Sequence, residues 1–155
     1  MNTESTTSAS GYDLRPLSDT ERAKFAEPLT PEERQVILHQ GTEAPFCGTL
    51  LNNKQSGIYA CRLCGLPLYQ AGTKFESGTG WPSFYQPLDP AHVREIVDRS
   101  HGMTRTEVRC RRCDAHLGHV FNDGPPPTHQ RHCLNSLSLE FFAEGTQPQQ
   151  REAKR

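Results

Sequence analysis

Two Cys-x-x-Cys pairs constrain this chain more than any other feature of its sequence. Cys61 and Cys64 form the first pair, Cys110 and Cys113 form the second, and residues 65–109 lie between them. Two turns that face each other supply the four thiolates of a tetrahedral zinc ion, and four sulfurs leave no coordination position for water or substrate. Because the interval exceeds the ~15 to 20 residues of a short zinc ribbon, the sequence predicts one structural Zn²⁺ that joins two distant hairpins. Two redox-active pairs are the alternative interpretation.

Composition limits the class of protein. The chain has 155 residues, 17 Lys and Arg against 18 Asp and Glu, and a net charge of −1. Its length predicts one domain, and its balanced charge argues against nucleic acid or an anionic membrane as a partner. No apolar run approaches the ~18 residues of a membrane span, and the amino end has no secretory signal pattern. We therefore expect a soluble cytoplasmic protein, in which cysteines are metal ligands or reactive thiols.

Both ends of the chain are polar and lack apolar periodicity. Residues 1–13 are rich in Ser and Thr, and residues 144–155 are polar and mixed in charge. Such segments bury too little apolar surface to order themselves. The sequence thus predicts flexible tails at 1–13 and 144–155 around one domain at 14–143.

Two Ser/Thr-x-x-Glu patterns follow the first tail and indicate helix starts, because such side chains satisfy free backbone N–H groups. The patterns are Ser18 with Glu21, and Thr30 with Glu33. Pro31 at the first helical position and Gly41 just past the end predict a helix over 31–40. Its Val36 and Ile37 are expected to dock on the core.

Beyond Gly41, short segments rich in Val, Ile, Tyr and Phe alternate with Gly and Pro, which predicts antiparallel strands. The clearest is 136–142, where Leu137, Leu139 and Phe141 alternate with Ser138 and Glu140. Shorter candidates are 57–60, 93–99, 105–109 and 117–121. Residues 123–128 (DGPPPT) predict a stiff loop, because three prolines remove three backbone donors.

Two cysteines are not needed for zinc, Cys47 and Cys133. Cys133 lies beside Arg131 and His132, whose cationic side chains would favour the nucleophilic thiolate if they point at it. Asn135, two residues on, would share its face of a strand. A buried structural cysteine is the alternative interpretation of Cys133.

Two histidines and the only tryptophan complete the candidate residues. His116 and His119 directly follow the second cysteine pair, and imidazole is the side chain best suited to proton transfer near neutral pH. Structural hydrogen-bonding histidines are the alternative. Trp81 lies in the glycine-rich stretch 78–84, which suggests a ring presented on a turn. It is either a core residue or a wall for an apolar group such as a methyl.

These segments together resemble the type B methionine-R-sulfoxide reductases over roughly residues 15–142. The matching stretches are GTEAPFCG (41–48), GIYACRLCGLPLY (57–69), KFESGTGWPSF (74–84), VRCRRCDAHLGHVFNDGP (108–125) and RHCLNSLSLEF (131–141). The resemblance implies a mainly β fold of two antiparallel sheets, with the short amino-terminal helical arm and a zinc-stapled pair of hairpins away from the active site.

The resemblance also implies roles for residues of this chain. Cys133 matches the catalytic nucleophile, Asn135 its neighbour in the site, and His116 and His119 the two site histidines, with the principal acid left open. The remaining matches are substrate-binding or flanking residues, namely Trp81, Phe121, Asp123 and Arg131. The activity implied is reduction of methionine-R-sulfoxide, free or in proteins, through a Cys133 sulfenic acid that a second thiol reduces.

This sequence departs from the family pattern at two positions. Thr79 stands where many members have a resolving cysteine, and His132 stands where an aromatic residue is common. Cys47 is then the non-zinc thiol left to form a disulfide with Cys133, and an external thiol is the alternative. We expect thioredoxin to reduce that disulfide, and we expect a monomer. A zinc-ribbon-like binding or chaperone module without catalysis is the rival function.

Overall fold

Each of the two helices begins at the cap that the sequence predicts. In the computed structural model, which describes residues 7–146, Ser18 caps α1 (Asp19–Ala26) and Thr30 caps α2 (Pro31–His39). In both caps the hydroxyl oxygen accepts a hydrogen bond from the backbone N–H of the Glu three residues on, and that carboxylate accepts one from the cap N–H. Both predicted capping boxes are confirmed.

The end of α2 differs slightly from the prediction. The helix ends at His39, one residue before the predicted end, and Gln40 takes the left-handed conformation with φ 59°. A left-handed residue with a side chain costs roughly 1 to 2 kcal/mol. The Gln40 side chain amide donates to the Glu107 carboxylate, which fixes this residue against the sheet. Val36 and Ile37 are buried, as predicted.

The remaining regular elements are nine strands and four short 3₁₀ helices within residues 7–146. The strands are β1 Gly57–Cys61, β2 Pro67–Gln70, β3 Lys74–Phe75, β4 Ser83–Phe84, β5 Val93–Asp98, β6 Arg105–Cys110, β7 His116–Phe121, β8 Arg131–Leu134 and β9 Leu139–Ala143. The 3₁₀ helices are Ala71–Thr73, Pro90–His92, Ser100–Gly102 and Ser136–Ser138.

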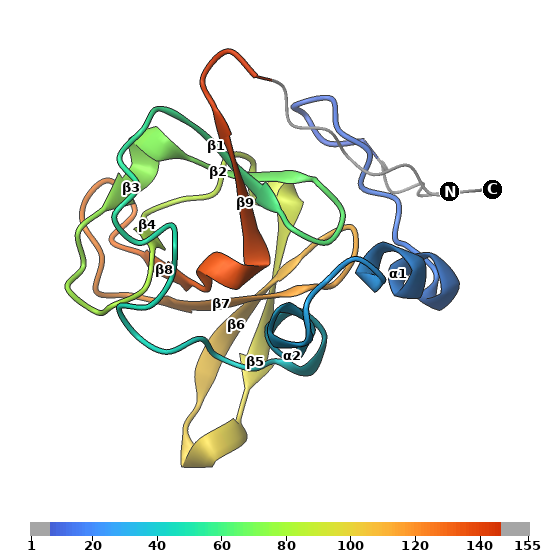
Figure 1. Ribbon diagram of the computed structural model, residues 1–155. Coiled ribbons are helices and arrows are strands. Elements are labelled where there is room, and N and C mark those ends of the chain that lie inside the picture. The colour runs from blue at the N-terminus through green and yellow to red at the C-terminus, as the bar shows by residue number, and fades with distance from the viewer. Residues whose placement is uncertain (1–6, 147–155) are drawn as a thin grey trace, which may run out of the picture.

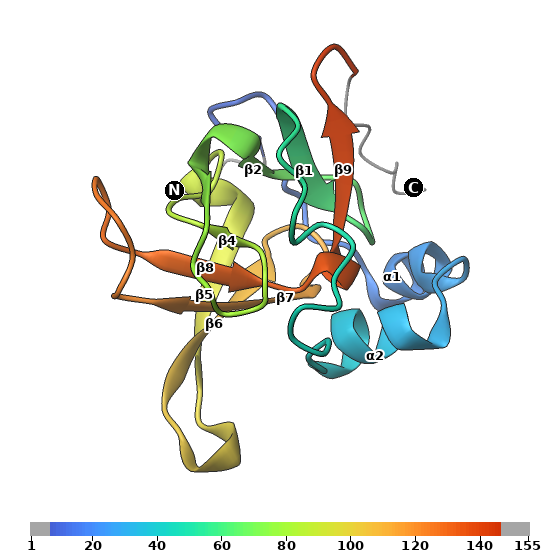
Figure 2. The same ribbon diagram turned by 60° about the vertical axis from the view of Figure 1, so that its left-hand side comes forward.

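The strands form two antiparallel sheets, which confirms the mainly β fold class (Figure 1). One sheet has the order β2-β1-β9, and the other has the order β3-β4-β8-β7-β6-β5. Figure 2 shows β8 in the middle of the larger sheet and the β5–β6 hairpin projecting from the body of the molecule. The helical arm lies beside the larger sheet, and α2 contacts β7 and the 136–138 turn.

The segment that reads as the clearest strand is only partly a strand. The prediction of a strand over 136–142 is wrong for Ser136–Ser138, which form a 3₁₀ turn, and β9 begins at Leu139. The Ser138 hydroxyl donates to the His116 carbonyl, and the Ser136 hydroxyl accepts from the Leu50 N–H. Because internal partners satisfy both hydroxyls, the serines are buried and Leu137 is half-buried, the reverse of the alternation that the sequence suggests.

The other predicted strands are confirmed to within two residues at each end, and residues 123–128 form a loop as predicted. Four strands were not predicted, namely β2, β3, β4 and β8. Each has two to four residues, too few for an alternating pattern to be recognised. One of them, β8, carries Cys133, so this cysteine belongs to a central strand of the larger sheet.

Part of the predicted tail at 1–13 lies within the described residues. The Ser8 hydroxyl is 2.8 Å from Nε2 of the buried His92, and the Ser10 hydroxyl donates to the Asp89 carboxylate at 2.7 Å. Residues 1–6 and 147–155 lie outside the described residues. The division into tails and a domain stays a prediction. No helix in the described part of the chain has the length and apolarity needed to cross a membrane.

Candidate active site and metal centre

The four Cys-x-x-Cys sulfurs meet between the two sheets. Cys61 and Cys64 lie at the β1–β2 turn, and Cys110 and Cys113 at the β6–β7 turn. The four Sγ atoms lie within 4.8 Å of one another, with Cys61 to Cys113 at 3.5 Å and Cys64 to Cys110 at 3.6 Å. A tetrahedral ion with metal–sulfur bonds of about 2.3 Å separates its ligands by about 3.8 Å, so the cluster fits one four-sulfur metal ion.

The two turns are built alike. In each, the N–H four residues after the first cysteine donates to that cysteine's carbonyl, from Gly65 to Cys61 and from Asp114 to Cys110. Gly65 and Asp114 both take positive φ, 82° and 63°. The shared geometry directs both cysteines of each turn inward, as ligands of a metal must be directed.

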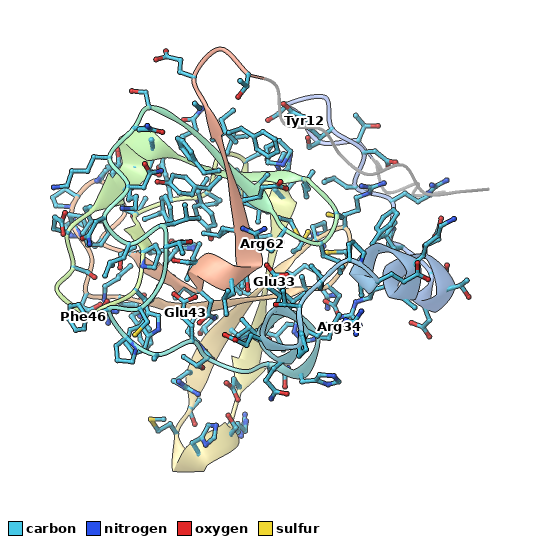
Figure 3. The ribbon with its side chains drawn as sticks, viewed as in Figure 1. Tyr12, Glu33, Arg34, Glu43, Phe46 and Arg62 are labelled. Carbon is cyan, nitrogen blue, oxygen red and sulfur yellow. The ribbon has the colours of Figure 1, made fainter. Side chains whose placement is uncertain are left out.

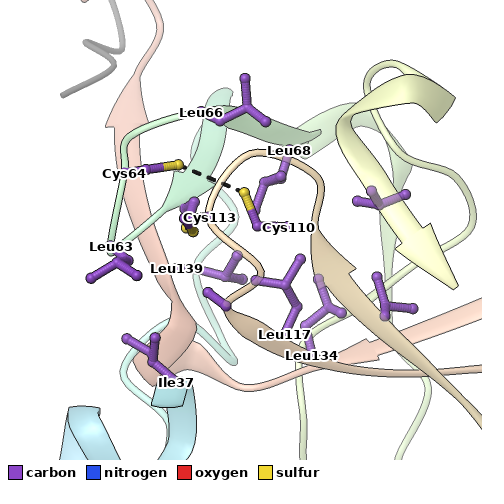
Figure 4. Close-up of a cluster of buried hydrophobic side chains, with 14 of the residues drawn as sticks. Ile37, Leu63, Cys64, Leu66, Leu68, Cys110, Cys113, Leu117, Leu134 and Leu139 are labelled. Atoms are coloured by element: carbon purple, nitrogen blue, oxygen red, sulfur yellow. Dashed lines mark hydrogen bonds between the residues drawn. The ribbon is translucent and has the colours of Figure 1, made fainter. Parts of the chain in front are cut away.

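The cluster is continuous with the hydrophobic core (Figure 4). All four cysteines are buried with leucines from both sheets, including Leu68 and Leu117. Arg62, between the first two cysteines, forms an ion pair with Glu33 of α2 at 3.5 Å (Figure 3). The cluster therefore joins both sheets and lies close to the helical arm, which is consistent with a structural metal.

A different group of residues lines one face of the larger sheet. Cys133 of β8 lies opposite His119 of β7, and His119 lies opposite Glu107 of β6. Directly opposite residues on antiparallel strands share a face of the sheet. Phe121 and Arg131 form the next pair of β7 and β8 on this face. The Arg131 guanidinium lies 4.4 Å from the centroid of the Phe121 ring.

This face opens into a pocket of about 280 Å³. Its lining includes the sequence-predicted residues Trp81, His119, Phe121, Arg131, Cys133 and Asn135. Thr42, Thr79, Arg105, Gly118 and Leu134 complete it. A small pocket with apolar rings and a few convergent polar groups is typical of a site for a small ligand or a single side chain.

The thiol of Cys133 is half-buried in this pocket. Burial raises its pKa, against smaller opposing contributions from Thr79 and Arg131. The Thr79 hydroxyl lies 3.9 Å from the Cys133 sulfur. The resting thiol is therefore protonated at neutral pH, although the sequence indicated cationic neighbours that favour thiolate.

The reason is that only one of those two neighbours faces the thiol. His132 lies on the opposite face of β8 and is buried, with Nδ1 2.9 Å from the Tyr69 hydroxyl and Nε2 3.2 Å from the Gln130 amide oxygen. Burial lowers the pKa of His132 to about 4, so the ring is neutral. The departure from the family at position 132 thus affects the interior and not the pocket wall.

Each of the two candidate site histidines has its own carboxylate. His119 Nε2 lies 2.8 Å from Asp98 Oδ2, and His116 Nδ1 lies 2.7 Å from Glu107 Oε2. Of the two, His119 lines the pocket. His116 is buried, and its Nε2 has no partner in the described structure. Burial lowers the pKa of His116, although Glu107 acts in the opposite direction.

Sequence reasoning missed Asp98, Glu107 and Arg105. All three lie in predicted strands, 93–99 and 105–109, but strand periodicity does not say which strands are neighbours. Asp98 and Glu107 can pair with the two histidines of β7 because β5, β6 and β7 are neighbours in that order. The available signal was weak, since charged residues alternate along 105–109 but not along 93–98.

Trp81 and Asn135 are held by the segment that follows α2. The Trp81 indole N–H donates to the Glu43 carbonyl at 3.0 Å, and the Glu43 N–H donates to the Asn135 side chain oxygen at 3.0 Å. The Asn135 amide also donates to the Leu117 carbonyl of β7. Trp81 is half-buried, and Asn135 is buried while it lines the pocket. Glu43 therefore connects the tryptophan turn to the sheet.

Asp123 and Cys47 lie outside the pocket lining. Asp123 is exposed and forms two hydrogen bonds with Arg131, at 2.9 and 3.2 Å, which hold the pKa of its carboxyl below the usual range. Cys47 is exposed on the loop that carries Glu43 and Phe46 (Figure 3). Phe46 is 68% exposed with φ 65°, and its N–H donates to the Gly80 carbonyl beside Trp81.

Comparison with known proteins is consistent with this geometry. Residues 29–143 match the family described as the SelR domain. The chain is 57% identical over 145 residues to the peptide methionine sulfoxide reductase MsrB of Caulobacter vibrioides. The matched region is 94% of this chain and 91% of that protein. It is 56% identical over 135 residues to the MsrB of Xylella fastidiosa strain M23, with 87% of each covered. The MsrB of Pseudomonas putida is 57% identical over 113 residues, 73% of this chain and 86% of that protein.

Proposed function

Because the chain belongs to the SelR family of type B methionine-R-sulfoxide reductases, we propose that it reduces methionine-R-sulfoxide with Cys133 as the nucleophile. Membership of this family supports methionine sulfoxide reduction as the class of activity of this chain. The observation that supports the assignment to Cys133 is the pocket, in which this thiol lies opposite His119 and beside the tryptophan turn.

The first step transfers oxygen from the substrate to Cys133. The thiol loses its proton, its sulfur attacks the sulfoxide sulfur, and the sulfoxide oxygen takes a proton. The S–S bond formed in this attack then breaks, as does the substrate S–O bond, and the oxygen moves to the Cys133 sulfur as hydroxyl. The products are methionine and a Cys133 sulfenic acid, so the sulfoxide gains the two electrons that Cys133 loses.

His119 is the proton donor in this proposal. It lines the pocket and pairs with a carboxylate, whereas burial favours the neutral form of His116. An acid must carry its proton within reach of the substrate oxygen. His116 then serves as a packed and hydrogen-bonded support for the His119 ring, whose centroid is 5.5 Å away.

The apolar and polar walls of the pocket would orient the substrate. Trp81 and Phe121 present rings to the substrate methyl and methylene groups, while Arg131 and Asn135 supply hydrogen-bond donors. Asp123 acts through Arg131, which its carboxylate holds in place. The pocket that Trp81, Phe121, Arg131 and Asn135 help to line would hold one methionine sulfoxide side chain, from the free amino acid or from a protein.

Cys47 is proposed to resolve the sulfenic acid. Its thiol would attack the Cys133 sulfur, form a disulfide and release the oxygen as water, and a thioredoxin-type dithiol would reduce that disulfide. Thr79, which contacts Cys133, has no sulfur to do so. A disulfide needs Cα atoms within about 7 Å, so the loop that carries Cys47 would have to swing toward the pocket.

The four-cysteine cluster is proposed to hold one structural zinc through Cys61, Cys64, Cys110 and Cys113. Zinc suits four thiolates, and a filled shell leaves no place for substrate. When bound, such an ion contributes roughly 10 to 16 kcal/mol to folding. Its role here is to join the two sheets, and the chemistry takes place in the pocket on the face that carries Cys133. A binding or chaperone module would leave that pocket without a purpose.

A thioredoxin-coupled assay with separated R and S epimers of a methionine sulfoxide peptide tests the function. We expect NADPH consumption with the R epimer, none with the S epimer, and none with Cys133→Ser. The free amino acid sulfoxide, assayed in parallel, shows which form is preferred. Equal rates on both epimers, or unchanged turnover in Cys133→Ser, would contradict the proposal. Sedimentation and cell fractionation test the expected monomer and its cytoplasmic location.

A further inference from the structure

The carboxylate of Asp98 lies on the β5–β6 hairpin and has three partners, two on the hairpin and one on β7. Asp98 ends β5, and its Oδ1 accepts a hydrogen bond from the Ser100 N–H at 2.9 Å. Its Oδ2 lies 2.8 Å from His119 Nε2 and 3.4 Å from the Arg105 guanidinium. Hydrogen bonds from Ser100, and then from His119, hold the pKa of Asp98 well below its usual value, so the group is an anion.

We propose that Asp98 is a positioning residue for sulfoxide reduction, which holds Nε2 of His119 and so fixes the orientation and tautomer of the ring toward the substrate. The inference rests on the proposed function, because it assigns the acid to His119. Asp98 does not line the pocket, and it acts through the histidine that does.

The geometry decides which ring nitrogen serves the substrate. With Nε2–H donated to Asp98, Nδ1 is the nitrogen that remains for the pocket. A proton on Nδ1 then requires the imidazolium, which an adjacent carboxylate stabilises through a charge-assisted hydrogen bond. After Nδ1 gives its proton to the sulfoxide oxygen, the neutral ring keeps Nε2–H on Asp98, so the ring does not rotate during the step.

The second histidine and carboxylate pair shows why Asp98 differs from Glu107. Glu107 is buried, and Arg109 approaches both of its oxygens, at 2.9 and 3.1 Å. Desolvation by burial raises the pKa of Glu107, but hydrogen bonds from Arg109 and then from His116 outweigh it and lower the pKa. The charge of Glu107 is thus already balanced by a guanidinium. Asp98 has its guanidinium neighbour at 3.4 Å, and its donors other than His119 and Arg105 are neutral groups of Ser100.

Other charged groups also surround His119. On the strands around it these are Asp98 on β5, Arg105 and Glu107 on β6, His116 on β7, and Arg131 and Cys133 on β8. Arg105 and Arg131 carry positive charge, and Glu107 is paired with Arg109 and His116. Asp98 is therefore the carboxylate that holds the His119 ring directly.

The test is single-turnover reduction of an R-sulfoxide peptide by Asp98→Asn, measured across pH. This nearly isosteric change removes the charge, and we expect a rate about 10- to 100-fold lower, part of the ~10² to 10⁴-fold contribution of a general acid. Asp98→Glu should recover part of the rate. The Glu32→Gln variant, which removes the same charge from an exposed side chain that does not line the pocket, is the control.

A double-mutant comparison separates positioning from a general structural effect. In a His119→Ala background, Asp98→Asn should cause no further loss of rate, because the group through which it acts is absent. Heteronuclear NMR of the imidazole should show the proton of His119 held on Nε2 in the wild type and a mixture of tautomers in Asp98→Asn, even in an inactive sample. Equal effects of Asp98→Asn with and without His119, or an unchanged tautomer, would overturn the inference. Wild-type rates in His119→Ala and Cys133→Ser would instead remove the proposed function.

Discussion

The cysteine cluster and the pocket use the same side chain in opposite ways. The cluster cysteines are fully enclosed, come from the rigid turns of paired strands, and contact one another. In the pocket, Cys133 is half-buried on a central strand, while Cys47 is exposed on a loop. Burial on all sides suits sulfurs that hold a metal, whereas a reacting thiol needs access and a mobile partner. The burial and the backbone setting of each cysteine therefore determine its role, since all six are the same residue type.

The largest expected effect comes from breaking the cluster. Cys110→Ser should lose the metal and most of the fold together, because the ~10 to 16 kcal/mol of a structural zinc site matches or exceeds the ~5 to 15 kcal/mol stability of a domain. Metal analysis and a thermal melt measure both. Full zinc content with an unchanged melting curve would show that this residue is not a ligand.

Breaking the pocket instead should leave the fold intact. Cys133→Ser should abolish sulfoxide reduction with thioredoxin and with dithiothreitol, because a neutral hydroxyl is a far poorer nucleophile than thiolate. Zinc content and melting temperature should stay close to wild type, since this side chain is not a ligand. Substantial turnover under dithiothreitol would place the nucleophile elsewhere.

The loop cysteine should affect recycling and not the first step. Cys47→Ser should reduce about one equivalent of sulfoxide per enzyme and then stall with thioredoxin, which attacks disulfides. A small thiol should restore turnover by attacking the sulfenic acid directly. In wild type, one equivalent of substrate should yield a Cys47 to Cys133 disulfide in peptide mass mapping. Normal thioredoxin-dependent turnover in Cys47→Ser would identify an external thiol as the resolver.

Replacing His119 should mainly lower the reaction rate, whereas replacing His116 should mainly lower the stability of the fold. His119→Ala should slow the single-turnover step by about 10² to 10⁴. His116→Ala should slow it less, and should cost about 1 to 3 kcal/mol of unfolding free energy, because Glu107 is left buried without one of its donors. Single-turnover kinetics and denaturant unfolding measure these quantities. A larger rate loss in His116→Ala would reverse the assignment of the acid.

The smallest expected effect concerns alkylation. In Cys47→Ser, the rate at which iodoacetamide modifies Cys133 should keep rising with pH beyond the ordinary thiol pKa of about 8.5, because burial raises the pKa of this thiol. A rate that levels off below that pH would mean that Cys133 is already a thiolate, and that Arg131 outweighs burial.

Local signals predicted the helices and the longer strands well. The capping residues Ser18 and Thr30 fixed the helix starts, since a cap depends on residues three positions apart. The alternation in 136–142 was misleading because Ser136 and Ser138 found buried partners, which are distant in the sequence. Strands of two to four residues, β8 among them, carry too short a pattern to be seen.

The cysteine pairs, the candidate nucleophile and the resemblance to a family of reductases can be recognised in the amino-acid sequence, because each depends on residue types at short spacings. The folded structure was needed to show that His119 lines the pocket while His116 is buried, that His132 faces the interior, and that Asp98 meets a histidine across β6. These contacts join strands whose order and register come from the packing of the whole sheet. Ionisation follows burial and distance, and neither can be read from positions along the chain.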